Sequence, residues 1–193
     1  MYNYHTHTYR CSHASGTPEE YIVRAIDNEI TSCEINENTA FIHEGAFRDC
    51  KNLKSITVPE SVTEIGNNSF RGCDSLETIE LTIKQGMSIL ASSLNASPIK
   101  KVVVREGSVL RGGEFNCLSE LETIIINANI EGIGSETFSD CTSLKQITLP
   151  SSIRYLESGA FRRCTSLESL VIPEGVSEIG AYAFEGCTSL RNL

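Results

Sequence analysis

Six cysteines recur at a nearly fixed interval along most of this 193-residue chain. They are Cys50, Cys73, Cys117, Cys141, Cys164 and Cys187, and their sequence numbers differ successively by 23, 44, 24, 23 and 23. The difference of 44 corresponds to two repeats in which one cysteine is missing. A fixed period of this length predicts a solenoid, in which each unit buries its apolar residues only by stacking on its neighbours. We therefore expect these cysteines to share one interior column.

Apolar residues repeat with the same period. The first position of each unit is held by Ile30, Leu53, Leu76, Ile99, Leu121, Leu144, Leu167 and Leu190. Two further apolar residues follow three and five positions later, as Ile56 and Val58 do, and their alternation predicts a short strand. In three units a proline, which has no N–H to donate, ends the strand: Pro59, Pro150 and Pro173.

The second half of each unit carries a glycine and a phenylalanine. The glycines Gly66, Gly134 and Gly180 suit a turn with positive φ. The phenylalanines are expected to stack along the axis as an aromatic spine, made of Phe47, Phe70, Phe115, Phe138, Phe161 and Phe184. The unit 76–98 has neither the phenylalanine nor the cysteine, so we expect Leu94 to fill the space and the segment Thr82–Ser97 to bulge or form a local helix.

The combined pattern, L-x-x-I-x-[VIL]-P-x-x-V-x-x-I-G-x-x-A-F-x-x-C, resembles the BspA-like leucine-rich repeat family over residues 30–193. The resemblance implies a β-rich, right-handed solenoid with a parallel sheet on one face, built from seven to eight units of about 22–23 residues each. Members of that family are commonly surface or secreted proteins that contact partner proteins. A non-catalytic scaffold that binds a protein partner is therefore the leading hypothesis for function.

The cysteine spacing favours buried thiols over disulfides. Cysteine at one repeated interior position behaves as a small apolar residue. Stacked strands lie about 4.8 Å apart, so distance alone does not exclude bridging. No CxxC pair occurs, which disfavours a zinc site.

Residues 1–29 do not follow the period. They contain His5, His7 and His13, and the stretch His5-Thr-His7, Arg10-Cys11, His13-Ala14 and Gly16-Thr17 through Tyr21 resembles the N-terminus of the PHP family of metal-dependent phosphoesterases. In that family the His-x-His pair ligates catalytic metals. After His13 the chain has only one more histidine, His43, inside a repeat, so an incomplete site at His5 and His7 would hold a divalent metal adventitiously at most.

A structural role is the alternative for this segment. Thr17, Pro18 and Glu20 predict a helix start, and a helix over 18–28 would lie on the first repeat as a solenoid cap. We therefore divide the chain into a PHP-like fragment, 1–29, and a repeat array, 30–193. A remnant phosphoesterase is the alternative function, and a fusion product without an evolved function is a third; no cofactor is expected.

Composition narrows the choice of partners. The net charge is −9 and no Lys/Arg run exists, which argues against nucleic acid. No stretch approaches the roughly 20 apolar residues of a membrane span, and the polar start lacks the features of a signal peptide. We expect the chain as given to stay in the cytosol unless an export signal has been lost. The segment Leu190–Leu193 is expected to form an open edge, which invites further repeats or end-to-end self-association.

Outward strand positions form two columns that a partner could contact. The first runs Ser55, Thr78, Lys101, Thr123, Gln146 and Ser169, and the second runs Thr57, Glu80, Val103, Ile125, Thr148 and Val171. Val103, Ile125 and Val171 are apolar where solvent is expected, which makes them candidate partner-binding residues together with Thr123 and Thr148. The alternative is that these β-branched residues serve strand propensity alone.

Overall fold

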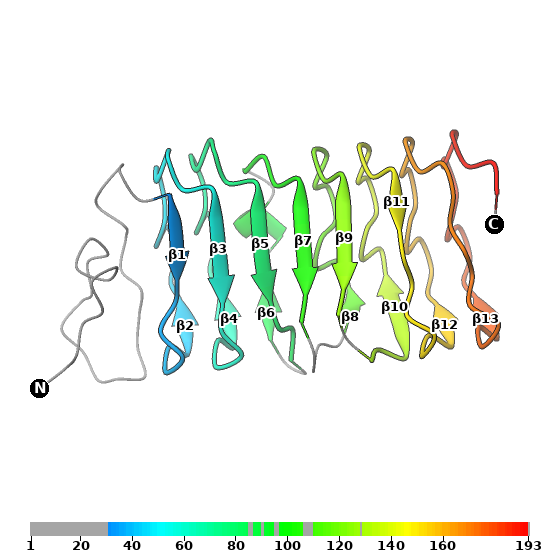
Figure 1. Ribbon diagram of the computed structural model, residues 1–193, viewed down its shortest axis with the longest axis horizontal. Coiled ribbons are helices and arrows are strands. Elements are labelled where there is room, and N and C mark those ends of the chain that lie inside the picture. Colours follow the sequence, from blue (N-terminus) through cyan, green and yellow to red (C-terminus); the bar gives the residue numbers. More distant parts are fainter. Residues whose placement is uncertain are drawn as a thin grey trace, which may run out of the picture. The chain divides into compact units, whose positions relative to one another are not determined.

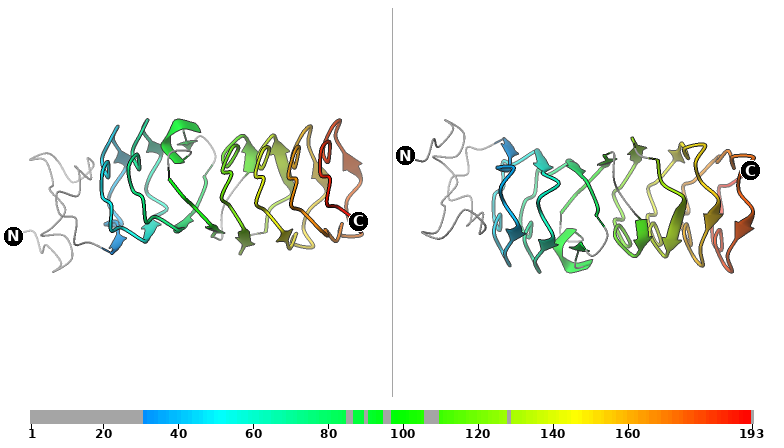
Figure 2. Two further views of the ribbon diagram at one scale, coloured as in Figure 1. Left: turned by 90° about the horizontal axis from the view of Figure 1, so that it is seen from above. Right: turned by 90° about the horizontal axis from the view of Figure 1, so that it is seen from below.

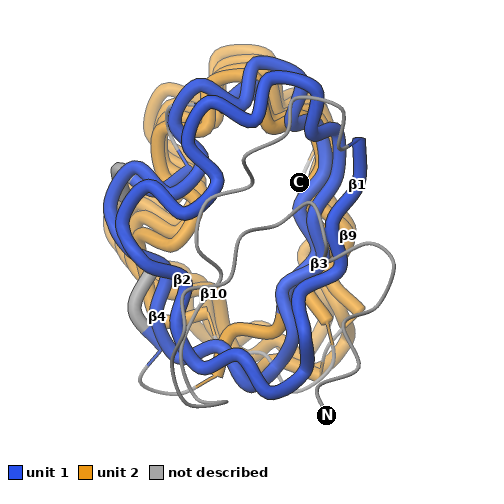
Figure 3. The backbone as a smooth tube through the Cα atoms, turned by 90° about the vertical axis from the view of Figure 1, so that its left-hand side faces the viewer, with its two compact units in different colours: residues 1–81, 86–98 blue, residues 82–85, 99–193 orange. Residues whose placement is uncertain are grey.

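The computed structural model describes residues 31–84, 87–89, 91–94, 97–105, 110–127 and 129–192. The chain divides into two compact units, residues 1–81 with 86–98, and residues 82–85 with 99–193 (Figure 3). The expected capping helix at 18–28 lies outside the described residues.

The first unit winds through two walls of parallel strands. One wall contains β1 (Ser32–Glu34), β3 (Ser55–Val58) and β5 (Thr78–Leu81), and the other contains β2 (Phe41–Ile42), β4 (Glu64–Ile65) and β6 (Ser88–Ile89). Figure 3 shows β1 and β3 on one side of the turn and β2 and β4 on the other. Ser32 pairs with Ser55 and Ser55 with Thr78, so the register advances by one repeat per strand.

The second unit repeats the arrangement. Its first wall contains β7 (Lys101–Val104), β9 (Thr123–Ile126) and β11 (Gln146–Ile147) (Figure 1). Its other wall contains β8 (Leu110–Gly112), β10 (Gly132–Ser135), β12 (Tyr155–Leu156) and β13 (Glu178–Ile179). Six of the eight expected first-wall segments are strands, and the last two are isolated bridges at Ser169 and Asn192.

Burial alternates along the strands as their sequences predict. In β3 the side chains of Ile56 and Val58 are buried, whereas those of Ser55 and Thr57 are half-buried on the outer side. The same alternation holds in β5 and β7. Because successive side chains of a strand point to opposite faces, the apolar partners all enter the interior.

The aromatic spine is confirmed in both units. The rings of Phe47 and Phe70 stack with centroids 5.5 Å apart and an interplanar angle of 13°. In the second unit, Phe138 stacks on Phe115 at 5.7 Å and on Phe161 at 5.4 Å, and Phe161 stacks on Phe184 at 5.7 Å. Side chains at equivalent positions meet face to face because the turns are stacked in register.

The thiol column lies beside this spine and is bonded to it. Four thiols donate a hydrogen bond to the carbonyl of the preceding turn's phenylalanine. The Sγ–O distances are 2.9 Å for Cys73–Phe47, 3.2 Å for Cys141–Phe115, 3.1 Å for Cys164–Phe138 and 3.0 Å for Cys187–Phe161. The carbonyls of Phe47, Phe138 and Phe161 also accept the N–H of the residue three positions later in their own turn, as Phe138 accepts from Cys141. One carbonyl oxygen thereby joins two turns.

Cys117 does not belong to the thiol column, contrary to expectation. It is exposed and has a φ of 60°, and its N–H donates to Ser139, as the N–H of Asp140 does to Arg162 one turn later. Leu118 is buried in its place, and its carbonyl accepts from Leu121 as that of Cys141 does from Leu144. The interval from Cys117 to Cys141, one position longer than the repeat, is the sign of this shift in the sequence.

The irregular unit 76–98 fills the missing positions with smaller residues. It contains the short helix α1 (Ala91–Leu94), and Leu94 is buried at the spine position, which confirms the expectations of a local helix and of Leu94 as filler (Figure 2). Ser97 replaces the thiol, because its hydroxyl donates to the Phe70 carbonyl at 2.7 Å. The buried Ser93 hydroxyl donates to the Gly66 carbonyl at 2.7 Å.

The repeated glycines serve close approach rather than positive φ, which corrects the expectation. A Cβ at Gly66 would lie 2.6 Å from the backbone nitrogen of Glu44, and one at Gly180 would lie 2.5 Å from that of Ser158. Neither glycine has a left-handed φ, nor does Gly134. Left-handed residues occur nearby with the period of the repeat, as at Gly45, where φ is 66°.

We expect Phe138→Ala to lower the free energy of unfolding by about 3–5 kcal/mol, because it removes a buried ring that stacks on both sides. Phe138→Leu should cost less, because Leu94 holds the equivalent position in the first unit. Urea denaturation measures both. As the control, Val171→Ala at a site 80% exposed should change stability by less than about 0.5 kcal/mol. Equal losses for all three variants would contradict the aromatic spine.

Gly66→Ala and Gly66→Asn should both lower the free energy of unfolding, by about 1–3 kcal/mol, because either Cβ collides with backbone. If Gly66 served positive φ instead, asparagine would be tolerated better than alanine. Thermal melts of the pair decide between these causes. Gly45→Asn is the matched control: φ is positive there, and Asn68 occupies the equivalent place one turn later with a φ of 54°.

Candidate interaction surface

The strand pairs of the first wall in the second unit align the first expected column and the Val103–Ile125 part of the second. Lys101 pairs with Thr123 and Thr123 with Gln146, and bridges continue this column to Ser169 and Asn192. In the second column, Val103 pairs with Ile125. The register thus aligns these side chains along the solenoid.

Exposure differs strongly between the three apolar candidates. Val171 is 80% exposed, whereas Val103 and Ile125 are half-buried. Thr123 and Thr148 are exposed. The accessible apolar surface is therefore greatest at Val171, with the hydroxyl groups of Thr123 and Thr148 on the same face. We call these five residues the outer sheet patch.

The same columns in the first unit are polar. They contain Ser32, Ser55 and Thr78 in one line and Glu34, Thr57 and Glu80 in the other. Parallel sheets in most proteins are covered on both faces, so a sheet face whose outward side chains reach solvent is a natural place for a partner. Because its outward columns include apolar side chains, the sheet face of the second unit is the better candidate for a partner contact.

A ladder of alternating charge flanks the outer sheet patch, and sequence reasoning missed it. The residue after each leading apolar position is, along the second unit, Lys100, Glu122, Lys145, Glu168 and Arg191. The backbones of neighbouring members are hydrogen-bonded, as the Glu168 N–H is to the Lys145 carbonyl. Lys145 Nζ lies 3.8 Å from Glu122 Oε2 in an exposed ion pair, which contributes about 0–1 kcal/mol. The alternation of charge is visible in the sequence at the residue that follows each leading apolar position.

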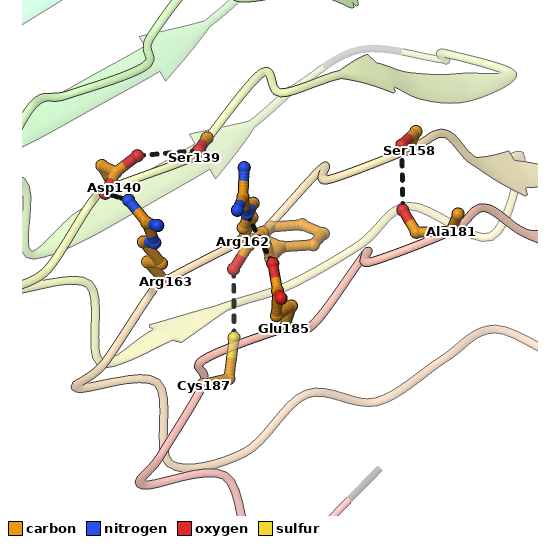
Figure 4. Close-up of polar contacts among 9 residues, drawn as sticks. Ser139, Asp140, Ser158, Arg162, Arg163, Ala181, Glu185 and Cys187 are labelled. Atoms are coloured by element: carbon orange, nitrogen blue, oxygen red, sulfur yellow. Dashed lines mark hydrogen bonds and ion pairs between the residues drawn. The ribbon is translucent and has the colours of Figure 1, made fainter.

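Further charged and polar contacts join the last turns of the second unit on another side (Figure 4). Arg162 Nε donates to Glu185 Oε2 at 2.6 Å, and Arg163 lies 3.7 Å from Asp140. The Ser158 hydroxyl donates to the Ala181 carbonyl at 2.9 Å. These partners lie about one repeat apart in sequence, so they connect one turn to the next.

The thiol column is mostly protected from ionisation. Burial raises the pKa of the Cys141 thiol to about 12. The pKa of Cys73 is raised by its side-chain hydrogen bond with Cys50 and then by burial, and that of Cys164 by its hydrogen bond with Cys187 and then by burial. Because the thiolate is the nucleophile and the metal ligand, a raised pKa disfavours the reactive form of these thiols. Cys187 differs: it is half-buried, and its hydrogen bond with Cys164 lowers its pKa.

The expected metal pair His5 and His7 lies outside the described residues. Among the residues that the structure describes, no three His, Cys, Asp or Glu side chains gather in a way that could hold a metal ion. The same part of the chain contains no helix with the length and apolar character needed to cross a membrane.

Stacked parallel strands whose register advances by one repeat per turn define a β-solenoid repeat protein. The sequence matches the BspA type leucine rich repeat region (six copies) over residues 26–109 and 108–193, so the chain belongs to this family. No match was found among proteins of curated function. No matched family corresponds to the PHP resemblance of residues 2–29.

Solved structures show the same fold. A leucine-rich repeat protein from Bacteroides ovatus is 27% identical with a TM-score of 0.58; the similarity covers 85% of this chain and 48% of that one. A leucine-rich repeat protein from T. pallidum is 25% identical with a TM-score of 0.63, over 88% of this chain and 82% of that one. This chain therefore spans about half the length of the Bacteroides ovatus protein.

Proposed function

We propose that the protein is a non-catalytic scaffold that binds a protein partner through the outer sheet patch. The observation that carries the proposal is the 80% exposure of Val171, which follows two residues after Ser169, where an isolated bridge continues the first wall. A partner that covers an apolar side chain exposed to that degree lowers the free energy of the complex. The family supports a binding role over catalysis, because function in repeat proteins resides on extended surfaces of the array.

The partner that fits this patch presents apolar side chains toward Val171 and hydrogen-bonding groups toward Thr123 and Thr148. The flanking charge ladder alternates in sign, so it favours a partner with mixed charge over a strongly acidic or basic one. The phosphoesterase alternative gains no support from the described residues or from the family match.

Val171→Glu and Ile125→Glu should abolish capture of the partner, because each places a charge in the apolar part of the patch. Neither should change stability by more than about 0.5 kcal/mol, since Glu80 occupies the equivalent column in the first unit. Pull-downs from a native extract, quantified against the wild type, measure the loss. Tyr182→Glu is the control: it removes an exposed apolar side chain away from the sheet, and Glu136 holds the equivalent position with similar φ. Retained capture by both sheet variants would contradict the proposal.

A further inference from the structure

The charge ladder of the second unit alternates in sign at every step from Lys100 to Glu168. The same position of the repeat carries Lys54 and Glu77 in the first unit, so the alternation extends over most of the repeat array in the sequence. An exposed position that needs only polarity has no reason to alternate. The order of the signs therefore points to oppositely charged neighbours.

Hydrogen bonds between turns fix the spacing of the charge ladder. The Glu122 N–H donates to the Lys100 carbonyl at 2.9 Å, and the Glu168 N–H donates to the Lys145 carbonyl at 3.1 Å. Between these two bonds, the parallel pairing of β9 with β11 continues the register. Neighbouring strands lie about 4.8 Å apart, so charges of one sign recur about every 9.6 Å along the ladder.

The ion pair inside the ladder leaves its charges accessible. Lys145 Nζ lies 3.8 Å from Glu122 Oε2, and the two side chains are 63% and 48% exposed. An exposed pair of this kind contributes little to the stability of one chain. An ammonium group has three donors and a carboxylate has two acceptor oxygens, so each group can bind a second partner while this pair is kept.

Charge complementarity selects a second copy of this chain as that partner, because its ladder has the same spacing and the same alternation. We consider a two-fold axis that passes between Glu122 and Lys145 and makes the two ladders antiparallel. Glu122 of each copy then faces Lys145 of the other, and the next members outward, Lys100 and Glu168, also meet with opposite signs. An axis through a member of the ladder would instead place like charges opposite each other, so the alternation sets the register of the contact.

We propose that two copies of this chain associate side by side and antiparallel along the charge ladder, with Glu122 of each copy facing Lys145 of the other. A parallel arrangement shifted by one repeat also matches the charges, but it does not close on itself. The proposal goes beyond the scaffold function, because the outer sheet patch binds a different protein. Contact between copies and capture of that partner are measured separately.

Sedimentation velocity of the full chain tests the association over a range of protein concentrations. A reducing agent is present, so the exposed thiol of Cys117 cannot link two copies. We expect the wild type to change from monomer to dimer at about 0.1 M salt. At about 1 M salt the association should weaken by about tenfold or more, because the Debye length falls from about 10 to about 3 Å.

Two charge reversals give the decisive comparison. Glu122→Lys and Lys145→Glu should each stay monomeric alone, because like charges then meet at both central contacts. An equal mixture of the two variants should dimerise again, since each lysine of one variant faces a glutamate of the other. Neither variant regains its internal ion pair on mixing, so a role confined to one chain cannot produce this recovery.

Glu131→Lys is the matched control. It makes the same change of charge at an exposed residue directly before β10, on the second wall, and should dimerise like the wild type. Thermal melts check that all three variants are folded. The proposal is overturned if the wild type stays monomeric at high concentration, if the single reversals dimerise like the wild type, or if their mixture stays monomeric.

Discussion

Within each unit, successive described turns are joined through backbone oxygens beside the aromatic spine. The carbonyl of Phe138 accepts the N–H of Cys141 within its own turn and the thiol of Cys164 from the following one. Both acceptor sites of the oxygen are used, so a buried polar group that would otherwise be costly becomes a connection between turns. A single turn cannot close a core by itself, and the stacked rings and these bonds provide the missing cover.

The irregular unit shows which parts of this connection are essential. Leu94 replaces the ring and Ser97 replaces the thiol, yet the hydrogen bond to the Phe70 carbonyl is kept. The chain therefore tolerates a change of side chain at both positions while it preserves the donor. Because the bond is kept rather than the residue, cysteine acts in the column mainly as a small, buried donor.

The side chains on the outer face of the first wall take no part in these hydrogen bonds or in the ring stacking, and they differ between the two units. The outward strand positions are polar in the first unit and include Val103, Ile125 and Val171 in the second. Because backbone bonds between turns are independent of these side chains, the sheet face can change without cost to the fold. Such a surface is suited to recognition, because packing between the turns leaves its side chains free to vary.

The sequence alone determined the solenoid, the inward strand positions and the phenylalanine spine, because each rests on a local pattern repeated along the chain. The tertiary structure decided what depends on neighbouring turns. It placed Leu118 rather than Cys117 in the column, since a shift by one residue becomes visible only when the turns are aligned in space. It assigned Gly66 to the close approach of the preceding turn's backbone. It separated exposed Val171 from half-buried Val103 and Ile125, because exposure depends on what lies beside a side chain and not on its own type.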